Sequence, residues 1–405
     1  MRKWFSLLLA FLMPFSMSGC WGKTEVEELG FIMAMGIDQG QSPDTYNITY
    51  QMGVPKKGGE GGGRSIDNLT LTVEAHSMRE SMDKVYSVSS RRPFVGTVKV
   101  IVVGEKLARS GINPALDFFQ RYYEFRRTAF LVISKGPAGQ LLGVETRQDK
   151  LAGLSILGII EQSKATSSFP VVRLGHYLTI LADEILAPVI PIAYPLKSGE
   201  AGMMYKGKEG DVAEEIRLSG AGVLKGDRLK DILSEKETRG NMFLQNEVKQ
   251  RFITAELEMG GKNSFASARI LTTRTKWKLE PMDGKVGIHY TITGTWDGDE
   301  LSGAQQRLSP SEWLNQYESK VNEAFTEVIQ EECVAAIQKS RELQLDFIGI
   351  GKHIQQRDPR YWKMVKDDWE NRLASFPVVV DVNLRPENEG TTIGPPTNPP
   401  GTGEE

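Results

Sequence analysis

The chain has 405 residues, of which 40% are hydrophobic, and its net charge is −3. This length allows two or three domains with their own cores, and the slightly acidic balance disfavours nucleic acid as a partner. No segment after the first twenty residues offers the roughly 18 consecutive apolar residues that a membrane-spanning helix needs.

The first twenty residues have the pattern of a bacterial lipoprotein signal. Two basic residues precede the apolar run 4–15, which is too short to span a bilayer and is typical of an export signal. Residues 17–20, Met-Ser-Gly-Cys, resemble a lipobox with methionine in place of the usual leucine. We expect residues 1–19 to be a lipoprotein signal peptide and Cys20 to be the lipid attachment site, because two acyl chains anchor a protein firmly to a membrane. An ordinary signal peptide followed by a chance cysteine is the alternative.

The next segment is predicted to begin a sheet. Residues 30–39 read as a buried strand, and residues 46–53 alternate between apolar and polar, which predicts an antiparallel pair. The glycine-rich run 55–64 predicts a mobile loop. It lacks the Lys-Ser or Lys-Thr pair of a phosphate-binding loop.

A βαβ unit is expected to follow. Residues 69–75 alternate as a strand, Ser77 and Glu80 have capping-box spacing at the start of a helix, and residues 97–103 form a buried strand. We expect the two strands to be parallel with a right-handed crossover. The patterns then predict helices at 105–109, 114–123, 150–163 and 174–186, extended segments at 128–134 and 188–197, and a turn at 136–143.

The C-terminal half is predicted to contain an antiparallel meander. Three β runs at 248–259, 264–280 and 285–296 alternate in polarity, as expected for a sheet with one solvated face. In the second run, strict alternation places Ile270 on the same face as Thr272.

A long helix is expected to pack across this meander. It begins with proline at its first position, Pro310, and should extend to about Glu342. A coiled-coil seam is the less favoured reading, because heptad charges are not sustained. The other elements expected in this half are a hairpin at 216–225 and 228–233, a capped helix from Ser234 to about Phe243, short helices at 347–354 and 359–373, and a closing strand at 376–385.

These elements give the domain organisation. We expect an N-terminal α+β domain at 20–197, as one unit or two subdomains, a linker or long exposed hairpin at 198–215, a C-terminal α+β domain at 216–385 and a disordered Pro/Gly tail at 386–405. The predicted fold class is therefore α+β and multi-domain. It has a mixed sheet with a βαβ unit in the N-terminal half and an antiparallel meander packed by a long helix in the C-terminal half.

The sequence lacks the motifs of common enzymes and metal proteins. Its four histidines are scattered without an HExxH pattern, and no GxSxG or Walker sequence is present. Cys333 falls on an apolar helical stripe, which predicts a buried and unreactive thiol. We expect no catalytic residues, no metal and no cofactor.

Five segments together resemble one known family. They are Gly19-Cys20-Trp21, Gly36-Ile37-Asp38, and the runs 91–112, 220–241 and 346–370. In this order and behind a lipobox, they resemble the Ger(x)C spore germination lipoproteins, the C subunits of the germinant receptors of endospore-forming bacteria. The chain departs from the family at Gly22, in the glycine-rich loop 58–63 and in its Pro/Gly tail.

The resemblance implies a non-enzymatic subunit of a nutrient germinant receptor that serves assembly and signalling. Such a subunit is lipid-anchored to the outer face of the spore inner membrane and works with the A and B membrane subunits. The nutrient, and whether this subunit contacts it, stay open.

The surface around Arg91, Arg92 and Phe94 is the predicted partner contact. Two guanidiniums and an aromatic are not needed for a core at this junction, and both residue types are favoured as interface anchors. Alternatively, Phe94 packs under the helix end and the arginines bind its carbonyls. A second basic-aromatic run at 120–128 suits a lipid or protein contact, or is an ordinary helix end.

Two other function classes are weighed against the resemblance. A solute-binding lipoprotein of a transporter needs two similar lobes around a cleft, whereas the two halves of this chain have different patterns. A cell-wall-associated enzyme needs a clustered catalytic set, which the sequence does not offer.

Overall fold

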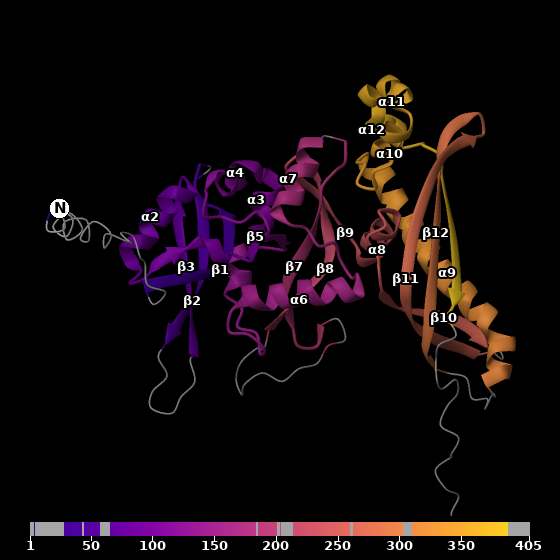
Figure 1. Cartoon of the computed structure of the whole chain (residues 1–405), viewed down its shortest axis with the longest axis horizontal. Coiled ribbons are helices and arrows are strands. Elements are labelled where there is room, and N and C mark those ends of the chain that lie inside the picture. The colour runs from indigo at the N-terminus through magenta and orange to yellow at the C-terminus, as the bar shows by residue number, and fades with distance from the viewer. Residues whose placement is uncertain are drawn as a thin grey trace, which may run out of the picture.

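The structure is a computed structural model that describes residues 28–42, 44–56, 65–183, 185–200, 214–259, 262–302 and 310–387, and the single positions 4 and 203. Two sheets with helices against them make up these residues (Figure 1), which confirms the predicted α+β class. The predictions for the signal peptide, Cys20, the loop 58–63, most of the linker and nearly all of the tail lie outside the described residues.

The first sheet has nine strands. They are β1 (Leu29–Gln39), β2 (Tyr46–Lys56), β3 (Ser65–Ala75), β4 (Arg92–Phe94), β5 (Val100–Gly104), β6 (Phe130–Ser134), β7 (Val189–Lys197), β8 (Glu214–Lys225) and β9 (Arg228–Leu233). The order is β3-β2-β1-β5-β6-β7-β8-β9, and β4 pairs with the start of β1. β1 and β2 are antiparallel as predicted, whereas β1, β5, β6 and β7 are parallel.

The expected βαβ unit is only partly correct. β3 and β5 run in the same direction, but β2 and β1 lie between them in the sheet. All five residues of β5 are buried, which suits a central strand, whereas β3 exposes Leu69, Thr70 and Thr72 and forms the sheet edge. The helix between them, α2 (Met78–Val88), begins at the predicted cap Ser77.

Helices cover both faces of this sheet. They are α2, α3 (Glu105–Ser110), α4 (Asn113–Arg121), α5 (Ala138–Leu142), α6 (Ala152–Thr166) and α7 (Leu174–Asp183). The two sets of side chains on β5 alternate, so Ile101 joins a core with α2 and α4, and Val102 joins a core with α5 and α6. The short helix α5 replaces the turn expected at 136–143.

The second sheet contains the predicted meander and one further strand. Strands β10 (Arg251–Met259), β11 (Lys262–Met282) and β12 (Lys285–Ser302) are antiparallel, and β13 (Val378–Pro386) joins β12 in parallel. The long helix α9 (Pro310–Leu343) packs on this sheet, as predicted. The remaining helices are α8 (Glu235–Leu244), α10 (Ile350–Arg357), α11 (Pro359–Val365) and α12 (Trp369–Leu373).

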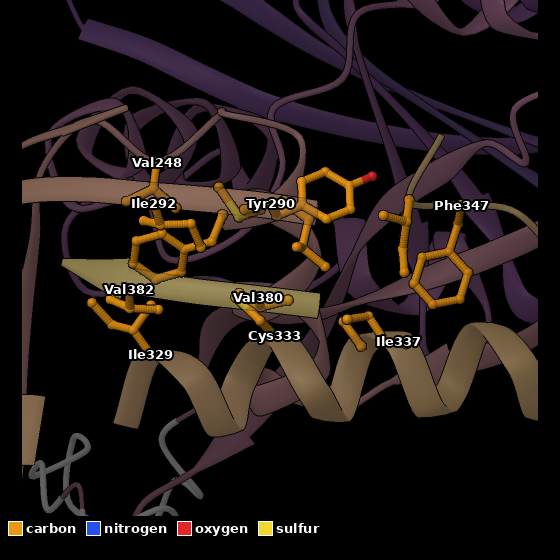
Figure 2. Packing of buried hydrophobic residues seen from close by; sticks show 14 of the residues in the cluster. Val248, Tyr290, Ile292, Ile329, Cys333, Ile337, Phe347, Val380 and Val382 are labelled. Carbon is orange, nitrogen blue, oxygen red and sulfur yellow. The ribbon is translucent and has the colours of Figure 1, made fainter. Parts of the chain in front are cut away.

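The core of this half lies between α9 and the sheet. Ile329 and Cys333 project from α9 toward Val380 and Val382 of β13, with Ile292 of β12 behind them (Figure 2). Cys333 is fully buried as predicted, and burial raises the pKa of its thiol far above its usual range. Full burial of an aliphatic side chain such as Ile329 stabilises the folded chain by about 1.5–3 kcal/mol.

The hairpin of β8 and β9 joins the two halves. The predicted hairpin of residues 216–225 and 228–233 is present and turns through Gly226, and β8 pairs with β7, so the hairpin belongs to the first sheet. Its inner side chain Val223 belongs to the same core as α9, because this end of the first sheet faces the second half. Lys352 and Asp183 form an ion pair of 2.6 Å across this junction.

Candidate functional site

The predicted contact residues lie at the entry to β4. Arg92 pairs with Leu29, the first residue of β1, and Phe94 pairs with Phe31. The hydroxyl of Ser89 donates a hydrogen bond of 2.7 Å to the backbone carbonyl of Arg91. The same hydroxyl accepts a hydrogen bond of 3.2 Å from the backbone N–H of Arg91. These bonds fix the backbone that presents Arg91 and Arg92. Phe94 is half-buried, so part of its role is packing.

Arg92 connects three separate elements. Its Nη2 lies 3.4 Å from Oε1 of Glu124, which follows α4, and its side chain is 46% exposed while that of Glu124 is 13% exposed. Hydrogen bonding to Tyr86 of α2, together with the negative charge of Glu124, raises the pKa of Arg92. Arg92 therefore stays charged at a partly open position where α2, β4 and the end of α4 meet.

Exposed apolar side chains lie on the elements that Arg92 connects, with Tyr86 and Val88 on α2 and Tyr123 after α4. Tyr123 is 85% exposed, Val88 is 68% exposed and Tyr86 is 41% exposed. The Tyr123 hydroxyl donates to Oε1 of Glu124 at 3.1 Å, so this ring lies beside the Arg92 ion pair. We call Tyr86, Val88, Arg91, Arg92, Phe94 and Tyr123 the Arg92 surface.

The Arg92 surface brings together the two basic-aromatic runs that the sequence showed separately. Arg91, Arg92 and Phe94 come from the first run, and Tyr123 comes from the second. Tyr86 and Val88 were not predicted as contact residues. The signal that could have indicated them is their position in the last turn of an amphipathic helix. There Val85 is buried, whereas Tyr86 and Val88 are exposed.

Two aspartates of the family-like segments have structural positions. Asp38 of Gly36-Ile37-Asp38 accepts hydrogen bonds from the backbone N–H groups of Ala138 and Gly139 at 2.8 and 2.9 Å. Burial raises its pKa, and these two bonds oppose the shift. Asp38 thus ties β1 to α5 and explains why this acidic residue sits at the end of a buried strand.

Asp346 has a similar place before α10. Its carboxylate accepts from the backbone N–H groups of Gly349, Ile350 and Gly351, and its side chain is almost completely buried. The glycine-rich 349–352 sequence therefore surrounds a carboxylate of the chain itself.

The described residues contain no group of three or more His, Cys, Asp and Glu side chains arranged to hold a metal ion. The histidines have separate surroundings. His76 binds Glu80, His289 lies between Glu280 and Asp381, and His353 stacks on Trp277.

Comparison with protein families covers nearly all of the described chain. The family described as "Spore germination protein N-terminal domain" matches residues 22–193, and the family described as "Spore germination B3/GerAC like, C-terminal" matches residues 219–390. The chain belongs to the Ger(x)C family of spore germination proteins. The resemblance inferred from the sequence is thus confirmed.

Curated Ger(x)C relatives align over almost their full length. "Spore germination protein KC" of Bacillus subtilis is 27% identical, and the match covers 92% of this chain and 93% of the relative. "Spore germination protein GerQC" of Bacillus cereus is 20% identical, over 97% of this chain and 100% of the relative.

A solved structure supports the Ger(x)C fold. The "Crystal Structure of the GerBC protein" is similar with a TM-score of 0.52 and 18% identity, and the match covers 90% of this chain and 100% of that one. At 18% identity this likeness shows the fold alone.

Proposed function

We propose that the protein is a lipid-anchored, non-enzymatic subunit of a nutrient germinant receptor. It works with the A and B membrane subunits on the outer face of the spore inner membrane, where it serves assembly and signalling. The observation that carries this proposal is the match to both Ger(x)C family domains across residues 22–193 and 219–390.

The lipid anchor is supported by the sequence around Cys20. The Met-Ser-Gly-Cys run places a cysteine directly after a short export signal, and two acyl chains at that cysteine hold the chain at a bilayer surface. Among the described residues, the structure contains no helix both long enough and apolar enough to cross a membrane.

The partner contact is supported by the place and composition of the Arg92 surface. Arg92 pairs with Leu29, which follows Cys20 by nine positions, so the surface lies within about 30 Å of the proposed lipid. Subunits embedded in the membrane are contacted most readily by a surface that lies close to the membrane. Arginine and tyrosine are also the residue types that most often supply binding energy at protein interfaces.

Purification of the full-length protein from dormant spores in mild detergent tests the proposal. We expect the A and B subunits to co-purify with it, and the mature protein to carry a diacylglyceryl group on Cys20 by mass spectrometry. Recovery of the acylated protein without any germinant receptor subunit would contradict the receptor role. Calorimetry with amino acids and sugars separates this role from solute binding, which predicts saturable heat in the isolated chain.

A further inference from the structure

We propose that the Arg92 surface also rests on the lipid bilayer, with the side chains of Tyr123 and Val88 entering the lipid–water interface. This inference rests on the proposed anchor at Cys20 and adds an orientation to it. The end of the molecule that carries α2 and β4 faces the membrane, and the second sheet lies away from it. The occupant of the exposed apolar positions is then lipid.

The connection to the anchor is the first argument. Leu29 is held in the first sheet by its pairing with Arg92, so the chain that leads back to Cys20 departs beside the Arg92 surface. The nine positions between Cys20 and Leu29 span at most about 30 Å. An acylated Cys20 therefore keeps this surface close to the bilayer at all times, and the opposite end of the molecule has no such constraint.

The exposed side chains are the second argument. Tyr123 and Val88 are among the most exposed large apolar residues of the described chain, at 85% and 68%. They come from different elements, because Val88 ends α2 and Tyr123 follows α4. Tyrosine has an apolar ring and a polar hydroxyl, which suits the lipid–water boundary.

The packing behind Tyr123 is the third argument. The Tyr122 ring lies 5.3 Å from the Tyr123 ring and stacks on Phe118 at 5.0 Å. Tyr123 thus projects from a layer of aromatic rings that is itself seated on the core through Phe119. A ring supported in this way loses little conformational freedom when it enters the interface.

The charges around these rings are also compatible with lipid headgroups. Glu124 is the acidic residue nearest to Tyr123, and it is mostly covered and paired with Arg92. Arg92 and Arg79 are both exposed, and Arg79 is close enough for its charge to act on Tyr122, while its Nε lies 3.9 Å from the exposed carboxylate of Asp83. Exposed guanidiniums on the same elements as exposed apolar side chains can bind headgroup phosphates while the apolar groups reach the boundary.

Vesicle binding by a chain without lipid tests this inference. The chain is produced from residue 20 with Cys20→Ser, so that any binding comes from the protein surface. It is sedimented with vesicles of phosphatidylethanolamine and phosphatidylglycerol. We expect measurable binding, and we expect the double variant Val88→Ser/Tyr123→Ser to lower the partition coefficient at least about fivefold.

The control variant is Phe252→Ser/Val379→Ser. These side chains are 60% and 42% exposed on the second sheet, which lies at the opposite end of the molecule from α2 (Figure 1). The control should bind vesicles as the starting chain does, and both variants should unfold at the temperature of the starting chain.

Two results would overturn the lipid contact. One is the absence of vesicle binding by the starting chain, or an equal loss in both double variants. The other is full vesicle binding by Val88→Ser/Tyr123→Ser. If spores with this variant also lose receptor subunits, these residues contact a protein partner instead. Neither result depends on acylation or co-purification, so failure here is distinguishable from failure of the proposed receptor role.

Discussion

The indole Nε1 of Trp369 donates a hydrogen bond of 3.1 Å to the carboxylate of Asp346, and both side chains are buried. The same carboxylate accepts the first backbone N–H groups of α10. Asp346 therefore holds α10 and α12 together, and Ala187 adds a bond of 2.9 Å from its N–H to the Asp346 carbonyl.

Asp346→Ala should destabilise the protein by about 3–5 kcal/mol, because four buried donors lose their acceptor. Asp346→Asn keeps one side-chain oxygen and should cost less than the alanine variant. Urea unfolding of the three proteins measures the difference. Equal stability of Asp346→Ala and wild type would show that the carboxylate is not what organises these helices.

His353 should make stability depend on pH. Burial, and then the charge of Lys352, lower the pKa of His353 to about 4, and its ring stacks on Trp277 with centroids 4.2 Å apart. Between pH of about 6.5 and 4 the unfolded chain binds a proton that the folded chain does not. The neutral His353 of the folded chain therefore lowers the free energy of unfolding as the pH falls through this range, by up to about 3 kcal/mol.

The matched variant is His353→Phe, which keeps a ring against Trp277 and removes the titrating group. Denaturant unfolding across this pH range should show a smaller decrease for the variant than for wild type. Identical pH profiles would mean that folding does not change the pKa of His353.

Gly240→Ala should destabilise the contact between α8 and α9. A Cβ at Gly240 would overlap the backbone carbonyl of Glu332, which belongs to α9 and cannot rotate away. We expect a loss of about 1–3 kcal/mol in the free energy of unfolding. Gly158→Ala in α6 is the control, because no atom lies within 4 Å of a Cβ added there. It should raise stability by about 1 kcal/mol, and a similar loss in both variants would contradict the close helix contact.

Cys20→Ala should release the protein from the membrane or leave its precursor uncleaved, with the fold intact. The reason is that nearly all membrane affinity comes from the acyl chains, and Cys20 precedes the first strand. Fractionation and the apparent mass of the protein measure the effect. A variant that is processed and as firmly bound as wild type would disprove the anchor assignment.

Local sequence signals predicted most elements because their causes are local. Ser234 and Glu237 form the complete capping box at the start of α8, as expected. The box at Ser77 is only half formed, because Glu80 accepts from the backbone of His76 instead. The choice between two neighbouring N–H groups depends on how the chain enters α2 from β3, which spacing alone does not specify.

Strand register, sheet membership and contacts between distant residues were less predictable from the sequence. Strict alternation put Ile270 with Thr272, but a register shift between them turns Ile270 into the core, where it is fully buried. The β8–β9 hairpin was recognised from its turn, whereas its sheet depends on pairing with β7. Arg92 and Glu124 are in contact although 32 positions separate them in the chain. The local pattern therefore indicated Arg92 as a contact residue but could not predict which side chains lie beside it.

The replacement of Arg91 and Arg92 by glutamate in spores tests the central claim most directly. A glutamate at position 92 faces Glu124, so we expect a loss of about 1–2 kcal/mol in the free energy of unfolding, which should leave the variant folded and on the membrane. The Arg274→Glu/Lys276→Glu variant makes the same charge change at exposed positions of β11 and serves as the control. We expect only the Arg91/Arg92 variant to have reduced amounts of the A and B subunits and slow nutrient-triggered germination. Normal subunit amounts and normal germination in a folded Arg91/Arg92 variant would contradict the account.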